Sequence, residues 1–235
     1  MAISISRKVC FLSLAVLVLS LSSGWAAEKS VIRPFNGKDL TGWKTVGGAP
    51  EETLKVGTAK LNPQNAKELI VEAGGSDLVN SQAHARDFYT EQKFGSATIE
   101  VEFMVPEGSN SGIYVMGEYE IQILDSFGRE TVSAGDLGGL YGAQAPSTNA
   151  AKAPGEWQKF VITFRAPQFD AAGNKTANAV FQRIVLNDKV IHENVEMKSQ
   201  TPGGVTGKEQ ATGPLMFQGN HGAVAFRNIC ITPLR

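Results

Sequence analysis

Cysteine, histidine and net charge are all scarce in this sequence. Only two of its 235 residues are cysteine and three are histidine, and the histidines lie far apart with no metal-ligand spacing between them. The formal charge is −1, so there is no basic field to attract nucleic acid by counterion release. Hydrophobic residues make up 42% of the chain, which is enough for a packed core and excludes a wholly disordered protein.

Long hydrophobic runs are also missing, apart from one near the N-terminus. That run, residues 9–21, has 13 residues and follows the basic pair 7–8. A bilayer core needs about 20 apolar residues, so the run is too short to span it and is typical of a signal peptide. Small residues before the site favour cleavage after Ala26, with Ala27 as the alternative. We therefore predict a signal peptide over residues 1–26, export to the periplasm or cell exterior, and no stable insertion in a membrane.

Removal of the signal peptide leaves Cys230 as the only cysteine of a single predicted domain, residues 27–235. Such a protein contains no internal disulfide and depends on its core for stability. Cys230 lies between two isoleucines in a strand-like segment, which predicts an inert buried thiol.

Apolar and polar residues alternate with period two in several segments, as expected of half-buried strands. The clearest cases are residues 96–105, 114–124, 160–164, 179–186 and 223–231. Gly117-Glu118 interrupts the second segment and Asn187-Asp188 follows the fourth, and both predict hairpin turns. No long segment shows a helical stripe, and 25 glycines suit many tight turns. The sequence predicts an all-β fold of two antiparallel sheets packed face to face.

A strand with unexpected polar residues, Tyr119–Asp125, is the candidate site. Glu120 and Gln122 share a face at about 6.6 Å, given 3.3 Å per residue. A one-residue bulge before Asp125 would bring that carboxylate to the same face. The pattern Glu-x-Gln-x-x-Asp then resembles the Glu-x-Asp-x-x-Glu catalytic strand of laminarinase-type glycosidases. Gln122 stands in place of the middle Asp, and Asp125 in place of the final Glu. The alternative is a solvated strand face with a turn-capping Asp125.

A second resemblance covers nearly the whole chain after the signal peptide. The blocks that carry it are Phe35–Trp43, Asn110–Tyr114, Tyr119–Ser126, Leu140–Gly142, Gly155–Trp157, His221-Gly222 and Val224–Ile229. In this order they resemble the 3-keto-disaccharide hydrolase family. The resemblance implies a concanavalin-like jelly-roll sandwich that acts on a carbohydrate substrate.

The resemblance also implies a chemistry and a set of roles. A ketone at C3 of a glycoside acidifies the C2 proton, so a base removes it and expels the C1 substituent, and water then adds back. Glu120 is the candidate base, with Asp125 as its acid partner or orienting group. His221, Asn110 and Gln122 would hold hydroxyls or the enolate.

Aromatic and cationic residues complete this set, with structural roles as alternatives. Tyr141 is a candidate stacking surface for a sugar ring, as is Trp157, for which a core position is the alternative. Arg227 would supply charge at the oxyanion or form a structural ion pair. Trp43 is expected in the core.

No cofactor follows from the sequence, although a divalent metal held by Glu120, Asp125 or His221 is compatible with the chemistry. His84 and His192 are expected to be structural or surface groups. Two other functions stay open, a non-catalytic carbohydrate-binding module and an ordinary laminarinase-type glycosidase. The oligomeric state does not follow from the sequence.

Overall fold

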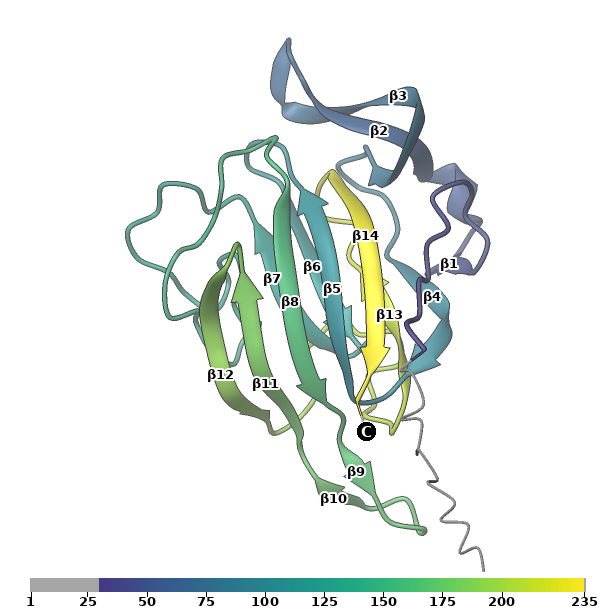
Figure 1. The fold of residues 1–235 in the computed structure, drawn as a ribbon, viewed down its shortest axis with the longest axis vertical. Coiled ribbons are helices and arrows are strands. Elements are labelled where there is room, and N and C mark those ends of the chain that lie inside the picture. The colour runs from purple at the N-terminus through teal and green to yellow at the C-terminus, as the bar shows by residue number, and fades with distance from the viewer. Residues whose placement is uncertain (1–29, 235) are drawn as a thin grey trace, which may run out of the picture.

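Antiparallel pairing joins the strands into two main sheets that pack face to face (Figure 1). The computed structural model describes residues 30–234, so the predicted signal peptide, residues 1–26, lies outside the described residues. In the first sheet the strand order is β1 (Trp43–Thr45), β4 (Phe88–Phe94), β13 (Gly213–Phe217), β6 (Asn110–Val115) and β7 (Tyr119–Leu124).

The second sheet has seven strands. Their order is β12 (Lys189–Met197), β11 (Ala179–Leu186), β8 (Gln158–Arg165), β5 (Ala97–Met104), β14 (Val224–Pro233), β3 (Asn65–Asn80) and β2 (Leu54–Asn62). A small separate pair is formed by β9 (Gln168–Phe169) and β10 (Lys175–Ala177).

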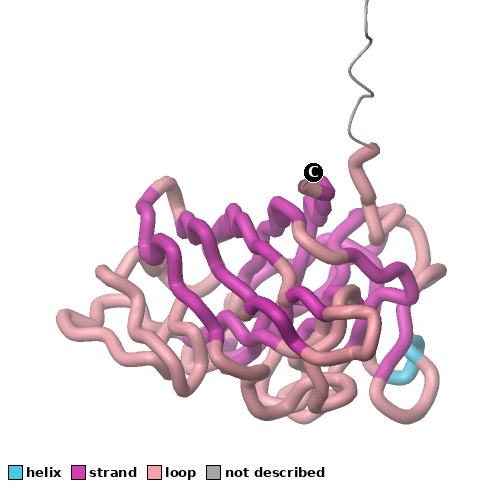
Figure 2. The backbone as a smooth tube through the Cα atoms, turned by 90° about the horizontal axis from the view of Figure 1, so that it is seen from below, coloured by secondary structure: helices cyan, strands magenta, loops and turns pink. Residues whose placement is uncertain are grey.

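Strands and loops make up nearly all of the described chain (Figure 2). Within residues 30–234 the one helical element is the 3-10 turn η1 (Pro50–Glu52). The same part of the chain holds no helix with the length and apolar character needed to cross a bilayer. The predicted all-β antiparallel sandwich is confirmed.

Both predicted hairpin turns are present, and their backbone explains their residue types. Met116 and Gly117 have φ of 53° and 71° between β6 and β7, and Asn187 and Asp188 have φ of 48° and 66° between β11 and β12. Two successive positive φ values define the turn whose twist matches that of the flanking strands. Period-two alternation is clearest in β5, where apolar residues face the core and Thr98, Glu100 and Glu102 face outward.

The core lies between the two sheets and is rich in aromatic rings. Phe217 of the five-stranded sheet stacks on Phe226 of the seven-stranded sheet, with ring centroids 3.8 Å apart. Trp43 lies 5.7 Å from Phe217 in the same cluster and is 4% exposed, as expected of a core residue. These rings join the sheets directly.

We expect Phe226→Ala to lower the free energy of unfolding by about 3–5 kcal/mol, because it removes a fully buried ring and leaves a cavity between the sheets. Urea unfolding of the purified protein measures this. Phe127→Ala is the control, since Phe127 is 57% exposed and should change stability by under about 0.5 kcal/mol. A loss below about 1 kcal/mol for Phe226→Ala would contradict the assignment of this stack to the core.

Cys230 corrects one expectation. Its side chain is half-buried rather than buried, and its Sγ lies 2.7 Å from Nη1 of Arg33. The pairing of β14 with β5 shifts between Arg227 and Cys230, which breaks the strict alternation on which the expectation of burial depended.

Candidate active site

A row of paired residues crosses the outer face of the five-stranded sheet. Tyr89 on β4 pairs with Met216 on β13, Met216 pairs with Tyr114 on β6, and Tyr114 pairs with Glu120 on β7. Directly paired residues share a face of the sheet, whereas their neighbours along each strand point the other way, into the core. The row therefore places a carboxylate beside a phenol on the solvent side of the sandwich.

Glu120 lies in a cleft of about 190 Å³. The cleft is lined by Asn110, Tyr114, Glu120, Gln122, Tyr141, Pro202, Gly203, Gln218 and His221. Five of the eight candidate residues named from the sequence are brought together here. They are Asn110, Glu120, Gln122, Tyr141 and His221.

Gly112 makes room for the carboxylate. It pairs with Gln122 and lies two residues before Tyr114 on β6, so it shares the cleft face with Tyr114, and its lack of a side chain leaves space there. A Cβ on Gly112 would lie 2.5 Å from Oε1 of Glu120 and 3.1 Å from Cγ. The Glu120 side chain therefore rests directly over the Gly112 backbone.

The segment after β7 folds back along that strand and brings Tyr141 to the cleft. Gln122 and the Gly138-Gly139 pair exchange backbone hydrogen bonds of 2.8 Å each, and Tyr141 N donates to Glu120 O at 3.3 Å. Tyr141 is 42% exposed, so its ring is available to a ligand. Such an exposed ring at a cleft wall suits stacking on a sugar ring.

His221 lies at the open edge of the cleft, in the loop that leads into β14. Its side chain is exposed and its Nδ1 contacts the side chain of Asn220. The other two histidines are a surface and a structural group, as expected: His84 is exposed with Nδ1 near Asn220 O, and His192 is buried with Nε2 2.8 Å from Gly138 O.

Burial changes the proton affinity of Glu120. The side chain is 3% exposed, and its desolvation raises the pKa of the carboxyl to about 7. The neighbouring Tyr114 hydroxyl acts in the opposite direction, whereas the negative charge of Asp87 raises this pKa further. A carboxyl with such a pKa exchanges protons readily at neutral pH, as a general base or acid must.

The Tyr114 hydroxyl has two acceptors within reach and one proton to donate. It lies 3.2 Å from Pro202 O and is a hydrogen-bonding neighbour of the Glu120 carboxyl. Burial, followed by the charge of Glu120, raises the pKa of Tyr114 above its usual range, so the phenol keeps its proton. Ionised Glu120 is the stronger acceptor, because charge-assisted hydrogen bonds exceed neutral ones.

Two amides of the cleft have unused hydrogen-bonding capacity. Asn110 Oδ1 and Gln122 Oε1 are buried and have no partner among the described residues. Unpartnered buried polar atoms are rare and cost free energy, which a ligand hydroxyl or a bound water would recover. Both side chains therefore suit the recognition of a hydroxyl-rich ligand.

Asp125 is not part of this cleft. The pairing of β6 with β7 runs without a shift from Val115–Tyr119 to Asn110–Leu124, so the predicted bulge is wrong. Instead, Asp125 Oδ2 accepts a hydrogen bond from Gly108 N at 2.9 Å and Oδ1 one from Phe127 N at 3.3 Å. The turn-capping alternative describes this residue.

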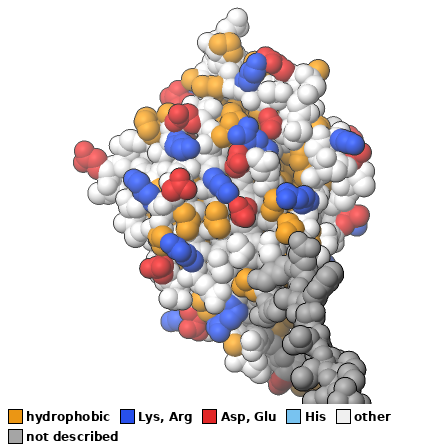
Figure 3. Space-filling model, in the orientation of Figure 1, with side chains coloured by type: hydrophobic (Ala, Val, Ile, Leu, Met, Phe, Trp, Pro, Cys, Tyr) orange, Lys and Arg blue, Asp and Glu red, His pale blue; other side chains and the backbone are white. Residues whose placement is uncertain are grey.

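Arg227 lies on the other sheet, and its expected place at the oxyanion is also wrong. Its Nε donates to Glu102 Oε2 at 2.7 Å, and its guanidinium lies 3.9 Å above the ring of Trp157. On the face shown in Figure 3, basic and acidic side chains are interspersed. Arg227 therefore forms the structural ion pair, and Trp157 is half-buried beside it, away from the cleft.

Comparison with known proteins identifies the family to which these features belong. The family described as the 3-keto-alpha-glucoside-1,2-lyase-like domain matches residues 30–232. The chain belongs to this family. The family resemblance seen in the sequence motifs is thereby confirmed.

Solved structures share the fold of this 3-keto-alpha-glucoside-1,2-lyase-like domain. A candidate glycosyl hydrolase from Parabacteroides distasonis is 28% identical, with a TM-score of 0.67 over 87% of this chain and 84% of that one. A second from the same organism is 19% identical, with a TM-score of 0.61 over 87% and 94% of the two chains, and supports the fold alone. A search of curated proteins found no match.

A resident metal finds no ready ligand set in this member of the family. Within residues 30–234 there is no group of three or more His, Cys, Asp or Glu side chains that could hold a metal ion. Asp125 accepts hydrogen bonds from the backbone N–H groups of Gly108 and Phe127, so it does not converge with Glu120 and His221, the other residues named as possible metal ligands.

Sequence reasoning missed three features of this domain's cleft: Tyr114, Gln218 and the loop at Pro202-Gly203. Tyr114 had a usable signal, because alternation along β6 places it on the face of Asn110 and Gly112. The loop had none, since its approach to the sheet depends on contacts between segments distant in the sequence.

The raised pKa of Glu120 predicts how stability depends on pH. Between its ordinary value and about 7, folded Glu120 holds a proton that the unfolded chain has released. The wild-type protein therefore loses up to roughly 3 kcal/mol of stability as pH rises through this window. We expect Glu120→Gln to abolish this loss and to be relatively more stable at pH 8 than at pH 5.

Urea unfolding of both proteins at the two pH values measures the difference. Glu72→Gln is the control, because it removes an exposed carboxylate of the seven-stranded sheet and should keep the wild-type difference. Equal pH dependence in wild type and Glu120→Gln would show that Glu120 titrates normally.

Proposed function

We propose that this protein cleaves the glycosidic bond of 3-keto-glucosides by removing the C2 proton and eliminating the C1 substituent. The observation that carries the proposal is Glu120, a carboxyl with 3% exposure and a pKa of about 7 at the base of a cleft. Membership of the 3-keto-alpha-glucoside-1,2-lyase-like family supports it.

The proposed reaction begins with proton transfer. Glu120 takes the proton from C2, and the electron pair moves toward the C3 ketone to give an enolate. The C1–O bond then breaks, C1=C2 forms, and the leaving oxygen receives a proton. Addition of water to the resulting enone completes net hydrolysis. The base needs a pKa near the working pH, and the enolate needs hydrogen-bond donors.

The other cleft residues have positions that suit these needs. The unpartnered amide oxygens of Asn110 and Gln122 would accept hydrogen bonds from substrate hydroxyls, and their NH2 groups would donate to hydroxyls or the enolate oxygen. The Tyr114 hydroxyl is next to the base. Tyr141 offers a ring for stacking, and it also borders a neighbouring hollow of about 540 Å³ that leaves room for the C1 substituent. His221 stands at the open edge.

An ordinary retaining glycosidase fits less well. Its double displacement needs a second carboxylate about 5–5.5 Å from the first. Glu120 is the single carboxylate among the cleft-lining residues of the described chain, and Asp125 is held in its turn. Proton abstraction with elimination needs one carboxylate only.

The decisive experiment compares two glucosides that differ only at C3, one oxidised to the ketone and one not. We expect turnover of the keto form alone, with kcat/KM rising with pH up to about 7 as Glu120 ionises. Equal turnover of both would overturn the proposed chemistry. Binding without turnover of either would favour the carbohydrate-binding module. A parallel reaction with a chelator tests for a metal.

We also propose that the reaction takes place outside the cytoplasm, because residues 1–26 have the features of a signal peptide. N-terminal sequencing of exported protein should begin at Ala27 or Glu28. An intact Met1 in that fraction would overturn this.

A further inference from the structure

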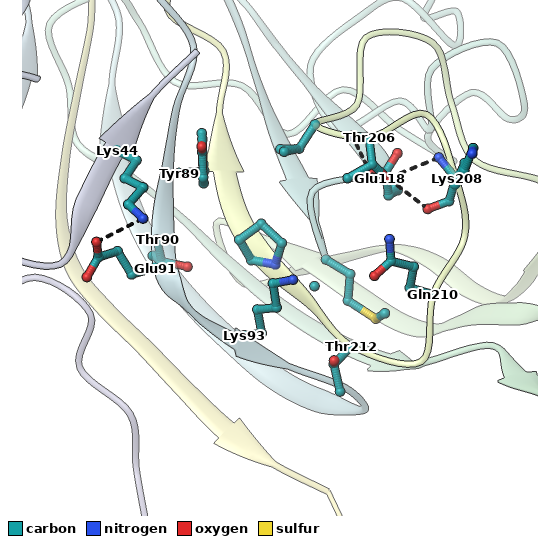
Figure 4. A pocket seen from close by; sticks show the side chains of 14 residues that line it. Lys44, Tyr89, Thr90, Glu91, Lys93, Glu118, Thr206, Lys208, Gln210 and Thr212 are labelled. Carbon is teal, nitrogen blue, oxygen red and sulfur yellow. Dashed lines mark hydrogen bonds and ion pairs between the residues drawn. The ribbon is translucent and has the colours of Figure 1, made fainter. Parts of the chain in front are cut away.

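Glu118 is a buried carboxylate outside the cleft, at the turn between β6 and β7. It is 4% exposed, and its partners all come from one loop. Oε1 accepts hydrogen bonds from Thr206 N at 2.8 Å and Thr206 Oγ1 at 2.7 Å, and Oε2 accepts one from Gly207 N at 3.0 Å. Figure 4 shows Glu118 joined to this loop at one end of a hollow of about 250 Å³.

The same loop, residues 201–207, forms a wall of the Glu120 cleft on its other side. Pro202 and Gly203 line the cleft. Thr201 Oγ1 accepts a hydrogen bond from Glu120 N at 2.9 Å, and Pro202 O lies 3.2 Å from the Tyr114 hydroxyl. A Cβ on Gly203 would lie 2.7 Å from that hydroxyl, so the loop backbone packs tightly against Tyr114.

The loop is fastened to the β6–β7 turn at both ends. At its start Thr201 N donates to Glu118 O at 2.9 Å, and near its end Val205 N donates to Gly117 O at 2.8 Å. The Glu118 carboxylate adds three further hydrogen bonds at this second end. Hydrogen bonds to a charged acceptor are stronger than those between neutral groups, so the carboxylate is the main anchor there.

We propose that Glu118 is a positioning residue that holds loop 201–207 against Tyr114 and Glu120 and so keeps water away from the base. Its effect on turnover rests on the proposed function, whereas its effect on Glu120 does not. Without the anchor the loop would move outward, and Glu120 would become better hydrated.

Hydration of Glu120 has a measurable consequence, because burial is the main cause of its raised pKa. The titratable side chains around Glu120 are Tyr114 from β6, Tyr141 from the segment after β7, His221 from the loop before β14, and Asp87 just before β4. A substitution at Glu118 replaces none of these side chains.

The test uses two variants that separate position from charge. Glu118→Gln keeps the length of the side chain but loses the charge and one acceptor. Glu118→Asp keeps the charge but is too short to hold both Thr206 and Gly207. The matched control is Asp77→Asn, a buried carboxylate of β3 whose Oδ2 accepts a hydrogen bond from Ala59 N at 2.9 Å on the other sheet.

Carboxyl-carbon NMR titration of Glu120 and amide hydrogen exchange of Thr206 and Gly207 need no substrate. We expect both Glu118 variants to lower the pKa of Glu120 and to speed exchange in the loop at least tenfold. Asp77→Asn should lower the melting temperature and leave both readouts unchanged. With 3-keto-glucoside, both Glu118 variants should lower kcat and move the acid limb of the pH profile to lower pH.

Thr206→Val is a second route if a Glu118 variant fails to fold, because it removes one loop donor at an exposed position. It should lower the pKa of Glu120 and speed amide exchange in the loop, both by smaller amounts. A lower pKa of Glu120 in Glu118→Gln but not in Glu118→Asp would show a direct effect of the Glu118 charge and overturn the proposal. A lower melting temperature of the Glu118 variants with no change in the pKa of Glu120 would also overturn it. Absence of 3-keto-glucoside turnover in the wild-type protein would count against the proposed function and not against this proposal.

Discussion

Glu120→Gln is expected to lower kcat on a 3-keto-glucoside by 10²–10⁴-fold, the usual cost of losing a general base. Glutamine keeps the size of the side chain but cannot accept the C2 proton at neutral pH. Because the carboxyl is desolvated in the folded protein, its removal should leave the fold intact. Steady-state kinetics at pH 7, with the melting temperature of both proteins, measure the two effects.

Asp125→Asn is the companion variant, since the sequence places both acids in one site and the structure separates them. Asp125 caps the turn at Gly108, so its amide variant should cost less than tenfold in kcat. A loss equal to that of Glu120→Gln would restore Asp125 to the site. Near wild-type turnover by Glu120→Gln would exclude Glu120 as the base.

Gly112→Ala is expected to lower kcat about 100-fold while changing stability little. The new Cβ would meet Glu120 Oε1 at 2.5 Å, and the flexible end of the glutamate would give way before the backbone does. Displacement of a catalytic group by about 1 Å costs on the order of 10² in rate. Kinetics on the 3-keto-glucoside and thermal unfolding test both parts.

The control for this variant is Gly135→Ala, whose Cβ would find its nearest neighbour, Ser133 Oγ, 3.8 Å away. It should behave as wild type. Gly112→Ala should have no further effect on rate in a Glu120→Gln background, because both changes act through one carboxyl. An unchanged rate for Gly112→Ala would show that Glu120 works from another position.

The local features of this protein follow from its sequence alone. Period-two alternation is a property of the chain itself, so β5, β11 and β14 and the β6–β7 hairpin could be predicted, together with the shared face of Glu120 and Gln122. Strands with little core contact could not be predicted from this alternation. Much of β3 is exposed, so its residues carry no apolar pattern to reveal it.

The composition of the site was decided by the tertiary structure. Alternation gives the face of a strand but not the sheet to which the strand belongs, and Arg227 lies on the opposite sheet for that reason. The predicted position of Asp125 in the site depended on a bulge, which the unbroken register of β6 and β7 excludes. Loop 201–207 reaches Glu120 only through hydrogen bonds between segments about 80 residues apart. The raised pKa of Glu120 has the same origin, because burial comes from the packing of distant segments around one side chain.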